Sequence, residues 1–165
     1  MNISKVCEKR KKKLLIVLKS TIPIGAEEKF NKYLRSSIQY GLICVPEFLA
    51  EGSAIENLLK PDRIIIGEGF GCTESDIKIV RDLHNWIEER NVIYTNTETA
   101  QLGKLASNAM LAQRVSSINS FTAICEKTKA DIGRLKEIVG SDKRIGEHFI
   151  NPSPGFGGSC FKKVC

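Results

Sequence analysis

The sequence predicts an α/β fold, in which a doubly wound parallel sheet is followed by a long central helix and a helical region. Two observations carry this prediction. Short apolar runs rich in β-branched residues alternate with segments of helical periodicity over residues 13–95, as in parallel sheets covered by helices. From residue 96 to 128 there is no proline, and Gly103 is the only glycine. We therefore expect a sheet domain over 1–95 and a central helical domain over 96–165.

The first half of the sheet is expected from three features. KLLIVLKST, residues 13–21, is a short apolar run with a turn after it, which is typical of a buried strand. Pro23 then opens a helix, PIGAEEKFNKYLRSS, with acids in its first turn and bases in its last. LICV, residues 42–45, is the second strand and is cut off by Pro46.

The second half repeats this order. RIIIG, residues 63–67, is the third strand, and Thr73 caps a helix whose apolar positions continue to Ile87. VIYT, residues 92–95, is the fourth strand. Ligands of such sheets bind beyond the carboxyl ends of the strands, so KST, VPEFLAEG and GEGFGC are all expected at that edge.

The residues after 95 predict one long, largely buried helix, because Ala, Leu, Ile and Val recur around its whole circumference. Lys104 and Asn108 lie four residues apart and therefore share a face. A lysine in an apolar stripe either needs a buried partner or extends to water at the helix edge, and periodicity alone leaves both readings open. A further helix, ADIGRLKEIVG, is expected to end at Gly140.

Composition narrows the function classes. The chain has 165 residues and a net charge of +6, much of it in the run Lys9–Lys13. No aromatic or Gly/Arg pattern accompanies this run, so a solvated basic segment or an anionic small substrate explains it better than nucleic acid. No apolar stretch approaches the roughly 20 residues of a membrane span, and no secretory signal is recognisable. We expect a cytoplasmic protein with no nucleic-acid or membrane partner.

Cysteine spacing bears on metal and disulfide chemistry. The six cysteines show no Cys-x-x-Cys spacing, and only His84 and His148 could add to a zinc site, so we expect no metal site and no disulfide framework. Cys160 stands out, because it follows the glycine-rich stretch SPGFGG, where backbone N–H groups could stabilise a thiolate. It is a candidate nucleophile.

Five motifs occur in order along the chain: KSTIP, VPEFLAEGSAIENLLKPDRIIIG, ETAQLGKLASNAMLAQRVSSINS, DKRIG and GFGGSCFKK. Together they resemble the UDP-glucose/GDP-mannose dehydrogenase family, from about Leu14 to Lys163. LAQRVSSINS and DKRIG are most similar to the members that oxidise UDP-glucose. The resemblance implies part of a Rossmann-like sheet, NAD as the cofactor and a UDP-sugar as the substrate.

The family oxidises a primary alcohol of a sugar twice, to the carboxylate, with two NAD⁺ and a cysteine that holds the intermediate. The resemblance implies that Cys160 captures the aldehyde as a thiohemiacetal, which is oxidised to a thioester and released by water. It implies that Lys104 stabilises the developing oxyanion or the alcohol proton, with Asn108 as its neighbour. Glu47 and Thr21 hold the water or act in acid–base transfer.

The resemblance also implies binding residues. Thr21, Glu51 and Lys163 would contact the cofactor, and Arg144 would reach the substrate of a neighbouring subunit. We accordingly expect a homo-oligomer, or association with an intact dehydrogenase subunit. The implied substrate-binding residues are Glu47, Phe48, Leu49, Ala50, Glu51, Lys104, Asn108, Arg144, Pro154, Gly155, Phe156, Gly157 and Gly158.

Three departures from the family pattern qualify this implication. No Gly-x-Gly-x-x-Gly turn precedes Leu14, Val164 stands where the family has an aspartate, and the sequence ends where the family continues into a second α/β domain. We therefore expect an internal fragment that does not oxidise UDP-glucose on its own. The alternative is an inactive interaction protein that pairs through its long helix. A cysteine hydrolase is disfavoured, because only His148 lies near Cys160 in the sequence.

Overall fold

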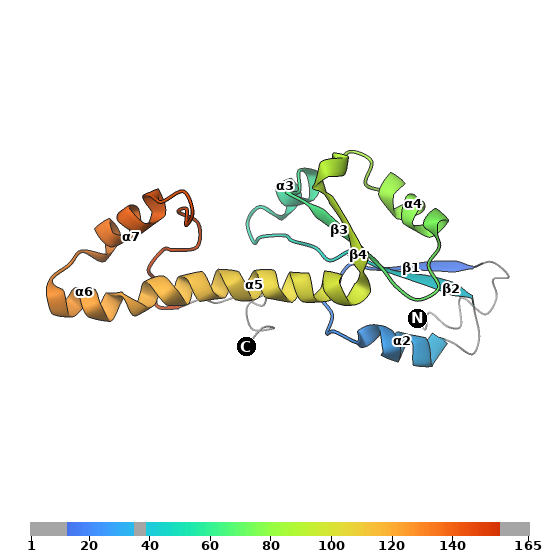
Figure 1. Cartoon of the computed structure of the whole chain (residues 1–165), viewed down its shortest axis with the longest axis horizontal. Helices are drawn as coiled ribbons and strands as arrows, with labels where there is room; N and C mark the ends of the chain where they lie inside the picture. The colour runs from blue at the N-terminus through green and yellow to red at the C-terminus, as the bar shows by residue number, and fades with distance from the viewer. Residues whose placement is uncertain (1–12, 35–38, 156–165) are drawn as a thin grey trace. The chain divides into compact units, whose positions relative to one another are not determined.

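The computed structural model describes residues 13–34 and 39–155 (Figure 1). Within them one sheet has four strands in the spatial order β1 (Leu14–Leu18), β2 (Tyr40–Cys44), β3 (Ile64–Glu68) and β4 (Val92–Asn96). The helices are α2 (Ala26–Leu34), α3 (Ala54–Leu59), α4 (Glu74–Asp82), α5 (Thr97–Ser120), α6 (Thr122–Thr128) and α7 (Ile132–Ser141), and a 3₁₀ turn, η1 (Glu89–Asn91), precedes β4. The chain forms two compact units, Met1–Lys104 and Leu105–Cys165. The predicted domain boundary at residue 95 stays a prediction.

Helices cover both faces of the sheet, which confirms the doubly wound fold class. On one face, Ile43, Ile64 and Ile66 pack with Val80 of α4. On the other face, Leu42 packs with Phe30 of α2, and a cluster that contains Cys44 and Ile65 packs with Ala100 of α5. Neighbouring residues of β2 therefore point to opposite helical layers, as the alternation of side chains along a strand requires.

One pair of strands departs from the expected parallel sheet. β1 pairs with β2 in parallel and β3 pairs with β4 in parallel, each over five residue pairs, but β2 and β3 are antiparallel. Their ladder is short, with Ile43 opposite Glu68 and Cys44 opposite Gly67. The connection explains this orientation, because α3 has no buried residues and does not pack across the sheet as a crossover helix does.

The antiparallel pair separates the predicted ligand segments. KST and VPEFLAEG follow the carboxyl ends of β1 and β2, but the glycine-rich turn at residues 67–72 runs back along β2 toward its beginning. Leu42 donates its N–H to the carbonyl of Phe70 at 2.9 Å, and Gly69 donates to the carbonyl of Leu42 at 3.0 Å. The expectation that all three segments share one edge is therefore wrong.

The ends of the helices in the first unit follow local signals. Thr73 and Asp76 form the capping box that opens α4, so the predicted cap is confirmed. The helix ends at Asp82 and turns follow, so the apolar residues as far as Ile87 continue a packing surface and not the helix. α2 begins at Ala26, three residues after Pro23, because Gly25 adopts φ +79°.

The predicted long helix is present over 97–128 with one interruption. α5 and α6 are separated by Phe121 alone, whose N–H bonds to the carbonyl three residues earlier. The expectation that this helix is largely buried is wrong for one side, because Leu102 and Met110 are more than half exposed. Among the described residues no helix has both the length and the apolar character needed to span a bilayer.

Gly140 does not end the last helix. α7 continues to Ser141, and Asp142 is its C-cap residue. Gly140 instead allows close packing, because a Cβ at this position would lie 3.2 Å from Ile150 Cδ1 and 3.3 Å from Glu147 Cα. Asp131 begins the helix by accepting a hydrogen bond from the N–H of Arg134 at 2.8 Å.

Candidate functional site

The carboxyl ends of β1 and β2 bring two predicted segments together. Val45 donates its N–H to the carbonyl of Leu18 at 2.8 Å, which keeps the chain beyond β2 beside the chain beyond β1. Lys19 Nζ then lies 3.5 Å from Glu47 Oε1, and both side chains are partly exposed. The predicted acid–base residue Glu47 therefore has a cation beside it, which the sequence did not indicate.

Phe48 lies between two cations. Its ring packs against the cluster of Cys44, Ile65 and Ala100. Arg63 Cζ lies 4.2 Å from the ring centroid and Lys104 Nζ lies 4.9 Å from it, and both distances are those of cation–π contacts. The predicted substrate segment and the predicted catalytic lysine thus meet through this aromatic ring.

Four polar side chains form a buried stripe on α5. Thr97, Gln101, Lys104 and Asn108 are separated by four, three and four residues, so they share one face of the helix. Each is at most 6% exposed. Lys104 is therefore buried with polar interactions and does not extend to water. Periodicity placed Lys104 and Asn108 on one face, but Gln101 was missed, although the spacing 97–101–104–108 could have indicated it.

The beginning of α5 is anchored by a buried carboxylate. Glu27 of α2 accepts a hydrogen bond from Thr97 Oγ1 and another from the N–H of Phe70. Burial raises the pKa of the Cys44 thiol to about 11, and the nearby charge of Glu27 adds to this shift. Cys44 is accordingly a neutral thiol near pH 7.

The remaining predicted residues of the first unit occupy the loop before α3 and the turn after β1. Thr21 and Leu49 are half-buried, whereas Ala50 and Glu51 are exposed. The loop is held by Asn57, whose Oδ1 accepts hydrogen bonds from the N–H of Ala50 and the hydroxyl of Ser53, both at 3.0 Å. Asn57 is a positioning residue that the sequence did not indicate.

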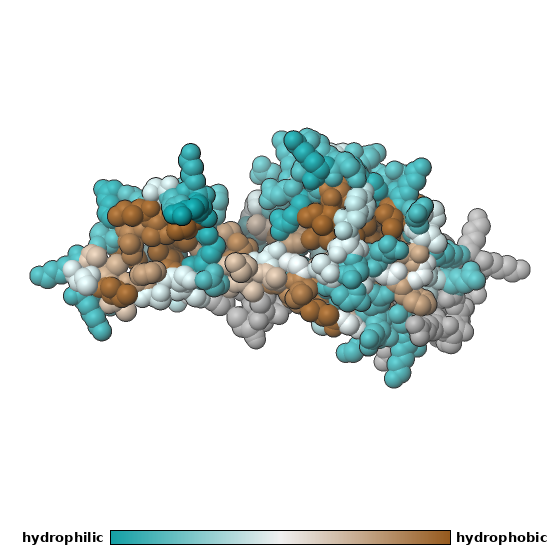
Figure 2. Space-filling model, viewed as in Figure 1, coloured by the Kyte–Doolittle hydropathy of each residue, from teal (hydrophilic) through white to brown (hydrophobic). Residues whose placement is uncertain are grey.

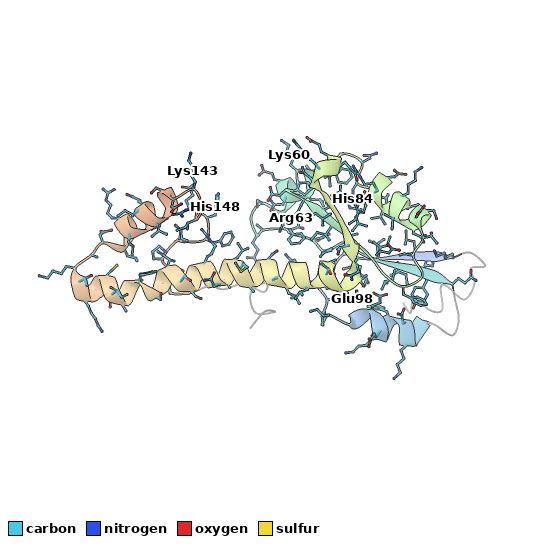
Figure 3. All side chains as sticks on the ribbon, in the orientation of Figure 1. Lys60, Arg63, His84, Glu98, Lys143 and His148 are labelled. Atoms are coloured by element: carbon cyan, nitrogen blue, oxygen red, sulfur yellow. The ribbon has the colours of Figure 1, made fainter. Side chains whose placement is uncertain are left out.

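A pocket opens beside this loop within the first unit. Figure 3 labels Arg63 and His84, which both line this pocket. His84 is fixed by Nδ1, which lies 2.8 Å from the carbonyl of Val80, and its ring stacks with Trp86 at a centroid distance of 5.6 Å. The charged and aromatic residues that line the pocket are Lys19, Glu47, Phe48, Asp62, Arg63, His84 and Trp86.

Apolar side chains reach the surface in both units (Figure 2). In the first unit Ile55, Leu59 and Trp86 are more than half exposed. In the second unit Ile138 of α7 is 69% exposed. Of these residues Trp86 lines the pocket of the first unit.

The second unit holds its predicted loop against α5. Arg114 donates to the carbonyls of Gly146 and His148, each at 2.9 Å, and the N–H of Ser153 donates to Asn119 Oδ1 at 2.9 Å. Pro154 and Gly155 lie at the exposed end of this loop. Asn119 and Arg114 were not singled out in the sequence, although both belong to the motif that carries the resemblance.

Arg144 is exposed and pairs with its own loop. Its guanidinium lies 2.7 Å from Asp142 Oδ2, and hydrogen bonds from Arg144 hold the pKa of that carboxyl below its usual value. The proposed role of Arg144 toward a neighbouring subunit stays a prediction. Five predicted site residues lie outside the described part of the chain: Phe156, Gly157, Gly158, Cys160 and Lys163.

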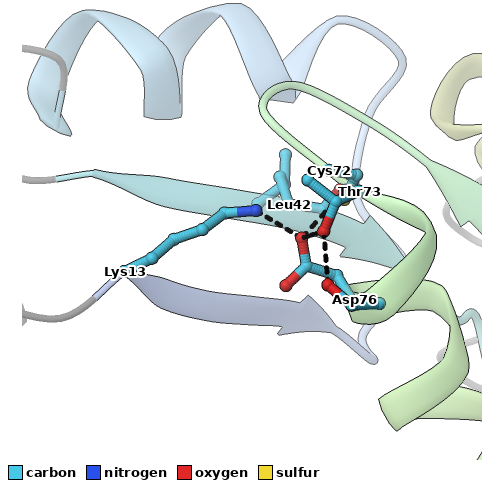
Figure 4. A network of polar contacts seen from close by, with 6 residues as sticks. Lys13, Leu42, Cys72, Thr73 and Asp76 are labelled. Atoms are coloured by element: carbon cyan, nitrogen blue, oxygen red, sulfur yellow. Dashed lines mark hydrogen bonds and ion pairs between the residues drawn. The ribbon is translucent and has the colours of Figure 1, made fainter.

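The glycine-rich turn at the opposite edge forms a closed polar network (Figure 4). Asp76 Oδ2 accepts hydrogen bonds from Lys13 Nζ, from Thr73 Oγ1 at 2.7 Å and from the N–H of Thr73 at 2.8 Å. Burial acts to raise the pKa of Asp76, but the hydrogen bonds from Lys13 and Thr73 outweigh it and lower the pKa below 3.8. Cys72 Sγ lies 2.8 Å from the carbonyl of Leu42. This network ties the beginning of β1 to α4.

Comparison with known proteins identifies the family. Residues 1–88 match the NAD binding domain of the UDP-glucose/GDP-mannose dehydrogenase family, and residues 98–165 match its central domain. The UDP-glucose 6-dehydrogenase of Drosophila melanogaster is 46% identical over 158 residues, which cover 90% of this chain and 33% of the relative. UDP-glucose 6-dehydrogenase 3 of Arabidopsis thaliana is 44% identical, with 90% and 32% covered. The chain thus spans about a third of the length of these curated relatives.

Solved structures agree with this assignment. A UDP-glucose dehydrogenase from Pyrobaculum islandicum superposes with a TM-score of 0.88 and 34% identity, over 98% of this chain and 38% of that one. A GDP-mannose dehydrogenase from Pseudomonas aeruginosa shares the fold, with a TM-score of 0.72 and 21% identity over 98% of this chain and 40% of that one. On these matches and on the fold described above, the chain belongs to the UDP-glucose/GDP-mannose dehydrogenase family.

Proposed function

We propose that this chain carries the lysine-centred part of a UDP-glucose dehydrogenase site, in which NAD⁺ oxidises the primary alcohol of UDP-glucose to the carboxylate in two steps. One observation supports this proposal most strongly. The buried ammonium of Lys104 lies 4.9 Å from the ring of Phe48, in the segment that also carries Glu47 and Glu51. A positive charge next to a polar loop is what oxidation of an alcohol requires.

In the first step the hydroxyl on C6 loses a proton and the C6 carbon loses a hydride, for which NAD⁺ would be the acceptor, and an aldehyde forms. Lys104 holds the developing negative charge on the oxygen, and Asn108, on the same face of α5, donates a hydrogen bond to it. Glu47, alone or through a water held with Thr21, takes the proton. Lys19 Nζ lies 3.5 Å from the Glu47 carboxylate that would take this proton.

The cofactor site is proposed beside these residues. NAD⁺, when bound, supplies the hydride acceptor. Thr21, Glu51 and Lys163 would hold it.

In the second step Cys160 adds through its sulfur to the aldehyde carbon. Loss of a hydride from the thiohemiacetal carbon, for which a second NAD⁺ would supply the acceptor, and loss of the hydroxyl proton to a base would give a thioester. Water attacks the thioester, and the carboxylate and the free thiol are released. The segments at Phe48–Glu51 and Pro154–Gly158 would cradle the UDP-sugar, and Arg144 would act on the substrate of a neighbouring subunit in a homo-oligomer.

The test is formation of NADH by the purified chain with UDP-glucose and NAD⁺, together with calorimetric titration of each ligand. Cys160→Ala and Lys104→Met are the matched variants, and Lys143→Met, on an exposed loop position, is the control. We expect Lys104→Met to lower the affinity for UDP-glucose and Lys143→Met to leave it unchanged, and any NADH that the parent chain forms to be absent from the Cys160→Ala variant. NADH formation that survives Cys160→Ala, or a chain that binds neither ligand, would overturn the proposal.

A further inference from the structure

The buried polar stripe on α5 contains one side chain that the proposed mechanism does not use. Within the first unit the stripe consists of Thr97, Gln101 and Lys104, which lie on successive turns of one helix face. Gln101 is the middle residue and is 2% exposed. Its position lies between the contact of Thr97 with Glu27 and the contact of Lys104 with Phe48.

The two neighbours of Gln101 have partners, but Gln101 has none among the described residues. Thr97 donates its hydroxyl to Glu27, and Lys104 lies against the Phe48 ring. Both polar atoms of the Gln101 amide, Nε2 and Oε1, are buried and make no hydrogen bond. Leaving a whole amide unpaired in a core destabilises a fold, and such groups in native proteins usually have a functional reason.

We propose that Gln101 is a ligand-binding residue, whose amide pairs with a neutral polar group of the molecule bound beside Lys104 and Phe48. This inference deepens the proposed function and rests on it. The side chain offers two N–H donors and one carbonyl acceptor. A phosphate or a carboxylate only accepts, so it would leave the buried carbonyl of Gln101 unpaired.

Two ligand groups both donate and accept and are therefore complementary to this amide. One is a sugar hydroxyl of UDP-glucose, and the other is the carboxamide of the nicotinamide ring. A neutral partner also suits the position, because the positive charge of Lys104 one turn away already serves the anionic oxygen of the reaction. A single trapped water is the competing explanation, and the affinities below distinguish it.

The experiment compares whole and truncated ligands on the full chain by isothermal titration calorimetry. NAD⁺ is paired with ADP-ribose, which lacks the nicotinamide, and UDP-glucose is paired with UDP, which lacks the sugar. Gln101→Leu removes both hydrogen-bonding atoms at similar volume. Gln113→Leu, an exposed position on the same helix, is the matched control.

We expect Gln101→Leu to lower the affinity for one whole ligand about tenfold and to leave its truncated partner unchanged. A loss of affinity for NAD⁺ but not for ADP-ribose would identify the nicotinamide carboxamide as the partner of Gln101. A loss for UDP-glucose but not for UDP would identify a sugar hydroxyl. Gln113→Leu should change neither. If the parent chain binds and Gln101→Leu alters neither affinity, the amide serves a trapped water or the fold, and this inference is overturned while the proposed function stands. If the parent chain binds neither ligand, the proposed function fails and this inference fails with it.

Urea unfolding of the free chain supplies a second readout. Because the amide lacks an internal partner, Gln101→Leu should raise the unfolding midpoint, whereas loss of a satisfied hydrogen bond would lower it. Higher stability combined with weaker binding is the signature of a group kept for its ligand. A lowered midpoint would show that the amide is bonded within the fold and would contradict the inference.

Discussion

Charged residues lie at both edges of the sheet in the first unit, but the interactions that they make differ between the two edges. At the edge where β1 and β2 begin, the charged groups are joined in a closed network, in which Asp76 receives hydrogen bonds from Lys13 and from both the hydroxyl and the N–H of Thr73. At the edge where β1 and β2 end, Arg63 and Lys104 both lie on the single ring of Phe48, and Lys19 pairs loosely with Glu47.

This difference separates a hydrogen-bonded network within the fold from cation–π contacts that lie beside the predicted ligand segments. A carboxylate that is buried with three hydrogen bonds contributes to stability and has little capacity left for another molecule. A cation–π contact is weaker than a charge-assisted hydrogen bond in a buried site, and it does not engage the N–H donors of the cation. The edge with the weaker internal bonding is also the one that carries most of the predicted site residues.

The largest loss of stability should come from adding a side-chain atom to the glycine-rich turn at residues 67–72. Gly71 has φ +67°, and a Cβ there would lie 2.3 Å from the carbonyl oxygen of Tyr40. Gly71→Ala should therefore lower the free energy of unfolding by about 3 kcal/mol or more, from strain and overlap together. Urea unfolding followed by the fluorescence of Trp86 measures it.

Gly25→Ala is the control for this substitution. Gly25 also has a positive φ, +79°, but nothing lies within 4 Å of a Cβ there. Gly25→Ala should lower the free energy of unfolding by only about 1 kcal/mol, because it adds backbone strain at a positive φ without any steric overlap. Equal losses for the two variants would mean that the contact with Tyr40 has no energetic weight and that the closed edge is less tightly packed than its geometry indicates.

An intermediate effect should follow from opening the ion network. Asp76→Asn removes the charge that faces Lys13 and should cost about 1–3 kcal/mol at pH 7. Because the pKa of Asp76 is lowered in the folded chain, its ionised form adds stability above the unfolded value near 3.8, and this contribution is lost as the pH falls through the lower folded value. The difference between the parent and the variant should therefore shrink below pH 4.

Urea unfolding at a series of pH values from 7 to 3 checks this dependence. Asp62→Asn, an exposed position, is the matched control and should give parallel curves. A difference between parent and Asp76→Asn that stays constant down to pH 3 would contradict the role assigned to the carboxylate charge.

The smallest effect is expected at the other edge. Arg63→Met keeps the apolar stem over Phe48 and removes the charge, so it should lower stability by only about 0.5–1 kcal/mol. Arg90→Met, at an exposed arginine, should have no measurable effect. A loss at Arg63 as large as that of Asp76→Asn would remove the contrast between the two edges.

The sequence predicted elements that depend on local chemistry. The apolar runs gave all four strands, and Thr73 gave the beginning of α4, because strand and cap preferences are set by a few neighbouring residues. The resemblance placed Glu47, Phe48 and Lys104 in one site, and the structure brings Phe48 and Lys104 together. The catalytic roles of these residues stay predictions.

Three features could not be read from local patterns. The direction of β3 depends on the path of the chain through α3 and not on the periodicity of either strand. Gly140 resembled a helix stop, but its packing against Ile150 and Glu147 is a tertiary contact. Gln101 was passed over because a glutamine in a helix is usually exposed, although its spacing from Thr97, Lys104 and Asn108 places it on the same helix face, where the structure buries it.

The antiparallel pairing of β2 and β3 also has a mechanical consequence. The sheet consists of two strand–helix–strand modules, β1–α2–β2 and β3–α4–β4. Within each module the two strands are aligned over five residue pairs, whereas only two residue pairs of the ladder between β2 and β3 join the modules. The weakest seam of backbone bonding therefore runs through the middle of the sheet and not along its margin. When a pulling force or a thermal fluctuation opens this unit, β2 and β3 should separate first, and the two modules should each stay intact.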